Sequence, residues 1–249
     1  MLYERLFGNV MALNRYLRML YIVPEVQRIS QCRILDIGCL DGHFTEYLTG
    51  RGNEVFALDT VDHGMRQRFA DVRMALGEGQ RLPFRDGVFD FVFCSDVLEH
   101  VENFEAIVPE ISHVLKRGRT CLISTVDGYW DPPIKLRAFL LSHLPPLARK
   151  VLMGRFALPD DSLHRGFMGH VRFDISLDKL KTVFCKAHLL PIKEQTYCRW
   201  VGSHLMEIFF SFNERIRFWT FPLLRLLLPL DRYVPFGRAW QYYVVFEKN

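Results

Sequence analysis

The stretch Arg33-Ile-Leu-Asp-Ile-Gly-Cys-Leu-Asp-Gly42, followed closely by Glu54-Val-Phe-Ala-Leu-Asp59, decides the fold. It predicts a strand, a glycine turn, a helix, and a second strand that ends in a carboxylate. This order is typical of a nucleoside-binding α/β sheet, because small residues let the backbone approach a ligand and an acidic side chain about 20 residues on can hold two ribose hydroxyls. A glycine loop can also serve the turn alone, so other residues must identify the nucleoside.

The alternation of strands and helices continues beyond this stretch. The pattern predicts, in order, strand 33–38, helix 42–51, strand 54–59, helix 63–73, strand 88–95, helix 103–116 and strand 119–126. Such alternation predicts parallel β-α-β units with right-handed crossovers, whose sites lie at the carboxyl ends of the strands. Functional loops are therefore expected after Ile37, Leu58, Phe93 and Thr125.

Two apolar-basic segments interrupt this pattern, and both are interpreted as inserts in a single domain. We expect one domain, 1–249, with N-terminal amphipathic helices that Pro24 divides, a core, a lid insert and a second insert: 1–29, 33–126, 128–170 and 202–240. The remaining predicted elements are a helix and two strands: 176–189, 192–200 and 241–246.

Composition narrows the class of protein. With 249 residues, of which 49% are hydrophobic, the chain can bury a sizeable core, and a net charge of +4 without a basic run does not argue for nucleic acid. Six cysteines without C-x-x-C spacing indicate reduced, buried thiols in a cytosolic protein. No signal-peptide core is visible, and the apolar stretches fall short of the roughly 20 residues that span a bilayer. A cytoplasmic location is expected.

Three further motifs identify the nucleoside. They are Gly77-Glu-Gly-Gln-Arg-Leu-Pro-Phe84, Phe89-Asp-Phe-Val-Phe-Cys-Ser-Asp-Val-Leu-Glu-His100 and Glu110-Ile-Ser-His-Val-Leu-Lys-Arg-Gly118. With them, residues 33–126 resemble the class I S-adenosylmethionine-dependent methyltransferases, in the small-molecule, type 11-like branch, which carries L-D-x-G-C-G-x-G, L-P-F, D-V-L-E-H and V-L-K-P-G-G. The resemblance implies a doubly wound, mostly parallel seven-stranded sheet, a Rossmann-like methyltransferase fold, with helical lid inserts.

The resemblance also implies the contacts of the cofactor, S-adenosyl-L-methionine, whose product is S-adenosyl-L-homocysteine. The methionine moiety would face Asp36 and the turn with Gly38, Cys39 and Gly42, and Asp59 would accept from the ribose hydroxyls. The adenine edge would meet Glu78, Gly79 and Gln80, and Ser95 and Leu98 would border the methionine and adenine faces. The chain departs from the family where Leu40 replaces the middle glycine, and where Arg117-Gly-Arg119 replaces Pro-Gly-Gly in what is expected to be a surface turn.

Methyl transfer needs aligned reactants and, for a weakly acidic hydroxyl, a base. The candidate bases are His100, in D-V-L-E-H, and His170, in a G-H-V-R segment similar to one in related methyltransferases; each can instead be structural. Arg172 and Tyr129 are candidate contacts of the acceptor, although Arg172 can equally pair with a nearby aspartate. No metal site is expected, because the histidines and cysteines lack ligand spacing.

The inserts bear on the acceptor and on partners. Their apolar-basic composition suits a small or lipid-like acceptor and peripheral membrane contact, but such helices also pack as a lid and core. We therefore expect a methyltransferase in which O or C methylation is favoured over N, with no nucleic-acid partner. A non-catalytic S-adenosylmethionine-binding protein of the same fold is the main alternative. A nicotinamide-dependent oxidoreductase is disfavoured by the missing third glycine of the dinucleotide motif.

Overall fold

The computed structural model describes residues 11–127, 143, 145, 174–199, 205, 214–234 and 239–249. The chain divides into two compact units. We call one the sheet unit; it comprises Ile22–Tyr129, His170–Gln195 and Gln241–Asn249. The other, the α11 unit, comprises Met1–Tyr21, Trp130–Gly169 and Thr196–Trp240, so it holds most of both expected inserts. The organisation as a single domain stays a prediction.

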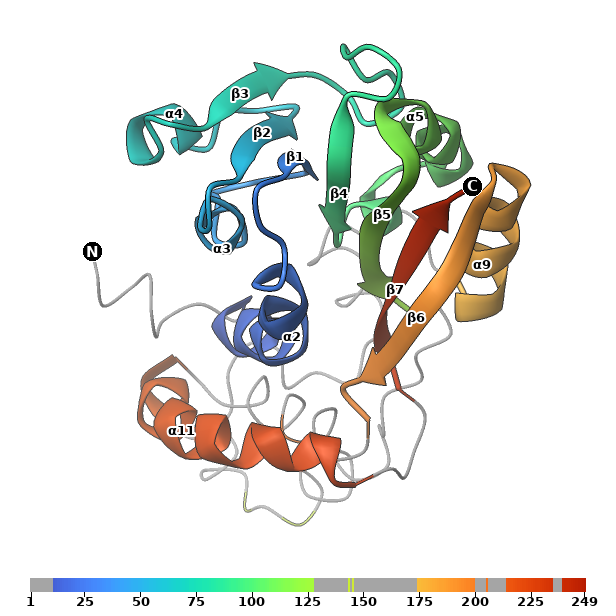
Figure 1. The fold of residues 1–249 in the computed structure, drawn as a ribbon. Helices are drawn as coiled ribbons and strands as arrows, with labels where there is room; N and C mark the ends of the chain where they lie inside the picture. Colours follow the sequence, from blue (N-terminus) through green and yellow to red (C-terminus); the bar gives the residue numbers. More distant parts are fainter. Residues whose placement is uncertain are drawn as a thin grey trace. The chain divides into compact units, whose positions relative to one another are not determined.

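A seven-stranded sheet has the strand order β3-β2-β1-β4-β5-β7-β6 (Figure 1). Its strands are β1 (Arg33–Ile37), β2 (Glu54–Asp59), β3 (Arg73–Leu76), β4 (Phe89–Ser95), β5 (Leu115–Val126), β6 (Leu189–Tyr197) and β7 (Gln241–Lys248). The five strands from β3 to β5 in this sheet order (β3, β2, β1, β4 and β5) pair in parallel, each with its neighbour. Strand β7 pairs with β5 in the antiparallel sense. The expected mostly parallel seven-stranded fold is therefore confirmed.

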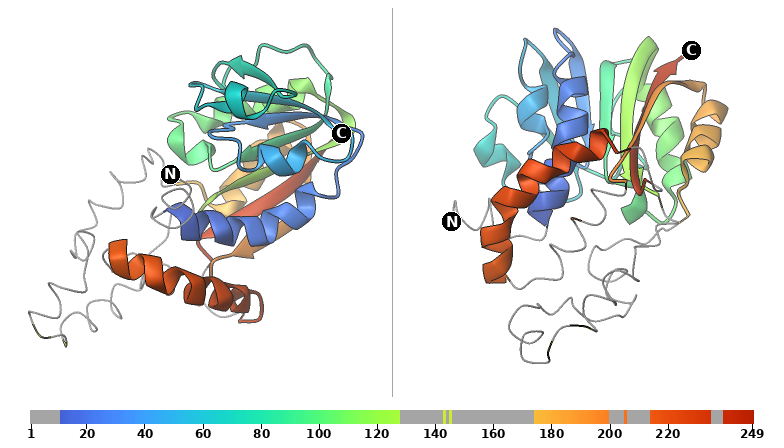
Figure 2. Two further views of the ribbon diagram at one scale, coloured as in Figure 1. Left: turned by 90° about the vertical axis from the view of Figure 1, so that its left-hand side faces the viewer. Right: turned by 90° about the horizontal axis from the view of Figure 1, so that it is seen from below.

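The described helices are α2 (Met11–Val26), α3 (Thr45–Leu48), α4 (Met65–Arg68), α5 (Ile107–Val114), α9 (Leu177–Lys186) and α11 (Glu214–Leu227). Three 3-10 helices are η1 (Leu98–His100), η2 (Phe104–Ala106) and η4 (Leu228–Arg232). Helices cover both faces of the sheet. Helices α5 and α9 lie side by side in Figures 1 and 2, and Ser112 Oγ of α5 donates to the carbonyl of Ala187 over 2.8 Å.

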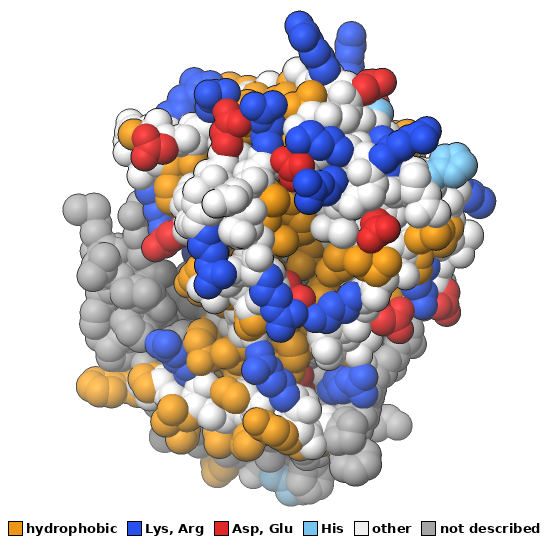
Figure 3. Space-filling view, viewed as in Figure 1, with side chains coloured by type: hydrophobic (Ala, Val, Ile, Leu, Met, Phe, Trp, Pro, Cys, Tyr) orange, Lys and Arg blue, Asp and Glu red, His pale blue; other side chains and the backbone are white. Residues whose placement is uncertain are grey.

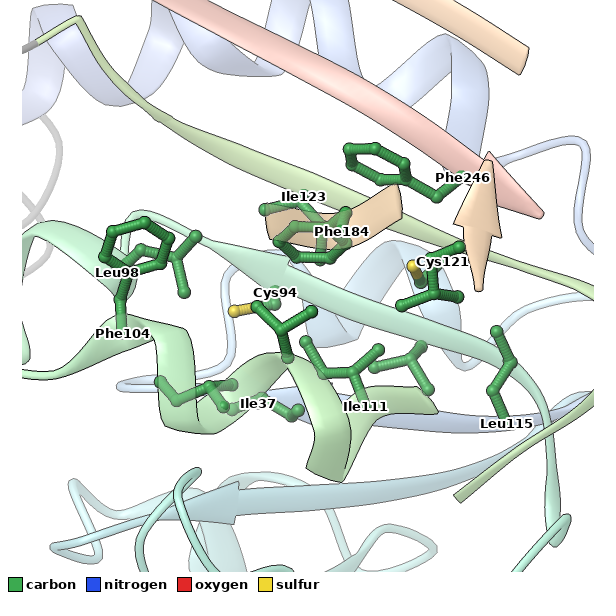
Figure 4. Close-up of a cluster of buried hydrophobic side chains, with 14 of the residues drawn as sticks. Ile37, Cys94, Leu98, Phe104, Ile111, Leu115, Cys121, Ile123, Phe184 and Phe246 are labelled. Atoms are coloured by element: carbon green, nitrogen blue, oxygen red, sulfur yellow. The ribbon is translucent and has the colours of Figure 1, made fainter. Parts of the chain in front are cut away.

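The main hydrophobic cluster lies between the sheet and this pair of helices. Alternate residues of β1, β4, β5 and β7 meet apolar residues of α5 and α9, and Figure 4 shows members of this cluster such as Ile37, Cys94, Ile111 and Phe184. Phe93, one residue from Cys94, points to the opposite face, where its ring lies 5.2 Å from that of Phe44. A strand buried on both faces explains the continuous apolar run that β4 shows in the sequence.

Several predicted boundaries are wrong, each for a local reason. The helix predicted at 63–73 is the short α4, followed by the strand β3, which the sequence pattern missed. The segment Arg117-Gly-Arg119 is not a turn after a helix but part of β5, where the pairing with β4 shifts register and Gly118 has a φ of +68°. The strand is therefore irregular at this point, and the positive φ of Gly118 is a conformation that glycine adopts readily.

Pro24 does not divide the N-terminal segment, because it lies inside α2. Proline lacks the N–H that would bond the carbonyl four residues earlier, that of Leu20. The guanidinium of Arg232 donates to this carbonyl instead, and it lies 4.9 Å from the ring centroid of Tyr21. The replaced hydrogen bond explains how the helix continues past proline.

Candidate cofactor site

Three adjacent strands end together at one edge of the sheet. Ile37 of β1 is in register with Leu58 of β2 and with Cys94 of β4, and the N–H of Gly38 donates to the carbonyl of Leu58 over 2.8 Å. The first residues after these strands therefore lie at the same edge, which is where parallel α/β sheets bind ligands. The structure thus gathers the turn after β1, Asp59 and Ser95, as the sequence predicted.

The turn after β1 requires its two glycines. Gly38 and Gly42 have φ values of +72° and +78°, in the left-handed region that glycine tolerates. A Cβ on Gly38 would lie 2.2 Å from Cγ2 of Val97, and one on Gly42 would lie 2.4 Å from Sδ of Met65. Both positions therefore need glycine for conformation and for space, whatever ligand the turn faces.

Leu40, the departure from the family motif, also has a left-handed backbone, with a φ of +48°. The conformation that a glycine would hold is thus kept, at a steric cost that a non-glycine residue bears. The Leu40 side chain is 42% exposed, so it projects from the turn instead of filling the core. The departure changes the surface of the turn and preserves its backbone path.

The carboxylate of Asp59 is half-buried and holds backbone groups of two loops. Its Oδ2 accepts from the N–H of Leu40 over 2.9 Å, and its Oδ1 accepts from the N–H of Thr60 over 2.7 Å. An ionised carboxylate offers about four lone-pair sites, so these bonds leave acceptor capacity for hydroxyl groups. Asp59 fits the predicted ribose contact and also fixes the shape of the turn.

Asp36, in β1, is a buried carboxyl beside the turn. It is 2% exposed, and Oγ1 of Thr45 in α3 donates to its Oδ2 over 2.6 Å. The pKa of Asp36 is raised to about 7, chiefly by burial; the Thr45 hydrogen bond acts to lower the pKa and the negative charge of Asp59 to raise it. The thiol of Cys39 is buried too, and burial together with Asp36 and Asp59 raises its pKa, so Cys39 is a packing residue without nucleophilic character.

The segment predicted to meet the adenine edge leaves β3 next to Asp59. The N–H of Gly77 donates to the carbonyl of Asp59 over 3.0 Å. A Cβ on Gly79 would lie 3.4 Å from side-chain atoms of Ile37 and Ile107, so Gly79 packs closely on the core. Glu78 is exposed, whereas the Gln80 amide donates to the carbonyl of Asn103 over 2.9 Å. The contacts of these residues with a cofactor stay predictions.

The residues predicted after β4 lie in different environments. Ser95, at the strand end, is 9% exposed, and its Oγ donates to Oγ of Ser124 over 3.4 Å. Leu98 is fully buried beside Phe104 in the hydrophobic cluster (Figure 4), and its contact with a cofactor stays a prediction. His100 ends η1 and is exposed.

Sequence reasoning missed a buried polar group in this region. Glu99, next to His100, is completely buried, and Oγ1 of Thr125 in β5 donates to its Oε2 over 2.8 Å. Burial raises the pKa of the Tyr242 hydroxyl, and the charges of Asp127 and Glu99 raise it as well. A carboxyl group is seldom completely buried in a protein, which makes Glu99 a candidate functional residue. The D-V-L-E-H motif does not indicate that Glu99 is buried while His100 is exposed.

Two exposed apolar residues, also missed, border the same edge. Val61 follows Asp59 by two residues and is 53% exposed, and its N–H donates to Oδ1 of Asp59 over 3.4 Å. Leu76, 51% exposed, is in register with Asp59 across β2 and β3. Apolar side chains beside the carboxylate that is predicted to bind the ribose would suit the face of a nucleobase. The sequence could have indicated Val61 because it follows the end of β2, whereas Leu76 ends β3, a strand that the sequence pattern missed.

The other predicted residues cannot be placed. His170, Arg172 and Tyr129 lie outside the described residues, as does most of the predicted lid insert. Within the described part of the chain, no group of three or more His, Cys, Asp or Glu side chains could hold a metal ion. Two further histidines have carboxylate neighbours: Asp41 lies 3.2 Å from Nδ1 of His43, and Asp86 lies 2.9 Å from Nδ1 of His113.

Comparison with known proteins agrees with this geometry. Residues 35–123 match the family model described as a methyltransferase domain. The chain is 33% identical over 134 residues to a ubiquinone biosynthesis O-methyltransferase of Xylella fastidiosa, a match that covers 50% of this chain and 51% of that protein. It is 34% identical over 103 residues to the biotin biosynthesis bifunctional protein BioHC of Cellvibrio japonicus, covering 40% of this chain and 20% of that protein. The chain thus matches only about half, or less, of these relatives.

A solved structure shows the same fold. The phosphoethanolamine N-methyltransferase 2 of Haemonchus contortus, in complex with S-adenosyl-L-methionine, superposes with a TM-score of 0.60 at 17% identity, covering 99% of this chain and 56% of that one. At this identity the likeness concerns the fold alone. The motifs of residues 33–126 and the match of residues 35–123 to a methyltransferase domain support a class I S-adenosylmethionine-dependent methyltransferase of the type 11 branch, and the strand order of the sheet agrees with that fold.

Proposed function

We propose that this protein transfers the methyl group of S-adenosyl-L-methionine to a small-molecule or lipid-like acceptor, at oxygen or carbon in preference to nitrogen. The observation that carries the proposal is the glycine turn locked to Asp59 at the sheet edge, by the hydrogen bond from the N–H of Leu40. The names of the relatives, which refer to ubiquinone and biotin biosynthesis, support a small-molecule acceptor.

The residues of the site fit this cofactor better than they fit a dinucleotide. A pyrophosphate needs a cradle of backbone amides close to a helix N-terminus. Here the carboxylate of Asp59 accepts from the N–H of Leu40 in the turn, and negative charge at this place would repel phosphate. The same charge suits a ligand with a cationic amino-acid end and free ribose hydroxyls.

The bound cofactor supplies a methyl group on a sulfonium. Its chemistry would be the transfer of this methyl group to an oxygen or carbon of the acceptor, which would release a proton while the sulfonium would become a neutral thioether. The protein has to align the two reactants and exclude water, and a base has to accept the proton when the acceptor is weakly acidic. We assign this role to His100 or His170, and contacts with the acceptor to Arg172 and Tyr129.

Two measurements test the proposal in order. Isothermal titration calorimetry with S-adenosyl-L-homocysteine should give a heat of binding that is lost or strongly reduced in Asp59→Ala. Absence of binding to the wild-type protein would refute the cofactor assignment. Turnover of labelled S-adenosyl-L-methionine against fractionated lipid and small-molecule extracts then tests transfer. Cofactor binding without turnover in any fraction would favour a non-catalytic cofactor-binding protein.

The acceptor atom follows from the labelled product. A product whose label is released by treatments that cleave methyl ethers or esters indicates O-methylation, whereas a resistant label on carbon indicates C-methylation. Variants His100→Ala and His100→Gln should lower turnover, and leave the affinity for S-adenosyl-L-homocysteine unchanged, if His100 takes the proton. Unchanged turnover in both variants would remove His100 from the proposal.

A further inference from the structure

Helix α11 and the 3-10 helix η4 expose an unusual number of large apolar side chains. The exposed residues are Trp219 (78%), Leu223 (59%), Leu226 (76%), Leu230 (47%) and Tyr233 (79%). The first three recur at intervals of four and three residues, so they share one face of α11. We call these five residues the α11 stripe. A single exposed leucine needs no explanation, but a continuous stripe of this kind marks a contact surface.

The buried face of the same helix is a different set of residues. Leu224 is 6% exposed and Leu228 is completely buried, and the buried carboxylate of Asp231 accepts from the hydroxyl of Tyr21 over 3.2 Å and from the N–H of Arg199 over 3.0 Å. The helix is thus already anchored within its own unit by one face. The α11 stripe is a second apolar face, which the packing of the unit does not require.

The charges of this segment have one sign where they are exposed. Residues 214–232 contain four arginines and two acidic residues in the sequence. Of the described side chains between 219 and 234, the exposed charged ones are Arg225 and Arg232, while Asp231 is buried. Figure 3 shows hydrophobic side chains with Lys and Arg among them over α11. A surface with negative charge would complement this arrangement.

The two arginines are held in place by aromatic rings of the same unit. The guanidinium of Arg225 lies 4.7 Å from the ring centroid of Tyr16, and that of Arg232 lies 4.9 Å from the ring centroid of Tyr21. Such cation–π contacts keep the positive charge in position without neutralising it. Both side chains remain exposed, so their charge is available to an outside partner.

We propose that the α11 stripe docks this protein on the surface of an anionic lipid bilayer. Tryptophan and tyrosine with leucine on one face, and arginine beside them, form the composition of helices that lie in the membrane interface. No described helix combines the length and the hydropathy needed to cross a bilayer. The inference extends the proposed function by naming a partner surface, and it does not depend on catalysis.

Co-sedimentation of the full chain with vesicles tests this proposal without cofactor or acceptor. At low salt, the protein should sediment with vesicles of phosphatidylcholine and phosphatidylglycerol, and much less with phosphatidylcholine alone or at high salt. The triple variant Trp219→Ser, Leu223→Ser, Leu226→Ser should lower the partition coefficient by about tenfold or more. The matched control Leu190→Ser, Ile192→Ser removes exposed apolar side chains of β6 and should bind as the wild type does.

A second measurement avoids the risk that the triple variant misfolds. Brominated acyl chains should quench part of the tryptophan fluorescence of the wild-type protein, and Trp219→Phe, which keeps the stripe apolar, should lose that part. The proposal is overturned by wild-type protein that stays in the supernatant with anionic vesicles, or by equal losses in the triple variant and the β6 control. It is also overturned by self-association that the triple variant abolishes, which would assign the stripe to a second copy of the chain. The proposed methyltransferase function is tested by titration with S-adenosyl-L-homocysteine, which uses no vesicles. A failure of the membrane proposal is therefore distinguishable from a failure of the proposed function.

Discussion

The N–H of Leu40 donates to Oδ2 of Asp59 over 2.9 Å, and Leu40 makes this bond from the left-handed conformation. The carboxylate assigned to the ribose is therefore also the acceptor that holds the glycine turn. One consequence is that a change at Asp59 alters the ligand contact and the path of the turn together. The substitutions have to be chosen so that the two effects separate.

Replacing Asp59 should weaken cofactor binding. Asp59→Ala removes charge-assisted hydrogen bonds, so the dissociation constant of S-adenosyl-L-homocysteine should rise roughly ten- to a hundredfold. Asp59→Asn keeps an acceptor for the N–H of Leu40 and should lose less. Calorimetric titration measures both. The control is Asp71→Ala, which removes the same charge from an exposed residue and should bind normally.

Position 40 should tolerate glycine and resist β-branched residues. Leu40→Gly relieves a left-handed leucine, which costs about 1 kcal/mol, and loses little burial because the side chain is 42% exposed. Its free energy of unfolding should stay within about 1 kcal/mol of wild type, with equal or tighter cofactor binding. Leu40→Val should be less stable than Leu40→Gly in urea denaturation. A valine variant as stable as the glycine variant would show that the conformation carries no strain.

The buried carboxyl of Asp36 should make stability depend on pH. In the unfolded chain it ionises near pH 3.8, whereas in the fold its pKa is about 7, so the folded state holds the proton more tightly between these values. The free energy of unfolding should therefore fall as the pH rises from about 4 to 7, by up to roughly 4 kcal/mol. In Asp36→Asn this part of the pH dependence should disappear. If the free energy of unfolding changed with pH in the same way in the wild type and in Asp36→Asn, the pH dependence would originate in another group.

Two glycines with similar backbones should differ in their tolerance of alanine. Gly38 and Gly87 have φ values of +72° and +60°, but a Cβ would clash with Val97 at Gly38 and would meet nothing within 4 Å at Gly87. Gly87→Ala should cost about 1 kcal/mol of stability from backbone conformation alone. Gly38→Ala should cost clearly more, and Val97→Ala should recover part of the difference. Chemical denaturation of the three variants decides this.

The bond between Thr125 and Glu99 should be worth more than an ordinary hydrogen bond. Thr125→Val keeps the shape of the side chain and removes the donor to a completely buried carboxylate, so it should cost about 1.5 to 3 kcal/mol of stability. A double-mutant cycle of Thr125→Val with Glu99→Gln should give a favourable coupling energy between the two side chains. Additive effects would mean that the pair is not coupled and that Glu99 depends on other neighbours.

Part of the fold of the sheet can be predicted from the sequence. Strands such as β4 are long, apolar and bounded by turns, so their existence follows from periodicity. The edge strand β3 has four residues, none of which is buried, so it gives no such signal. The contacts at the sheet edge follow the same division. Asp59 could be assigned because it ends a strand, whereas the bonds of Thr45 to Asp36 and of Thr125 to Glu99 join separate elements that periodicity cannot pair.

The position of β7 between β5 and β6 has a consequence for the order in which the protein folds. Five parallel strands precede it in the chain, but the pairing of Gln241–Lys248 with β5 closes a loop of more than a hundred residues. Closing such a loop is entropically costly and slow compared with local pairing. During synthesis, the row of backbone groups on β5 stays open until residues 241–248 have emerged. Until then, this edge is where a nascent chain is most exposed to aggregation and to chaperones.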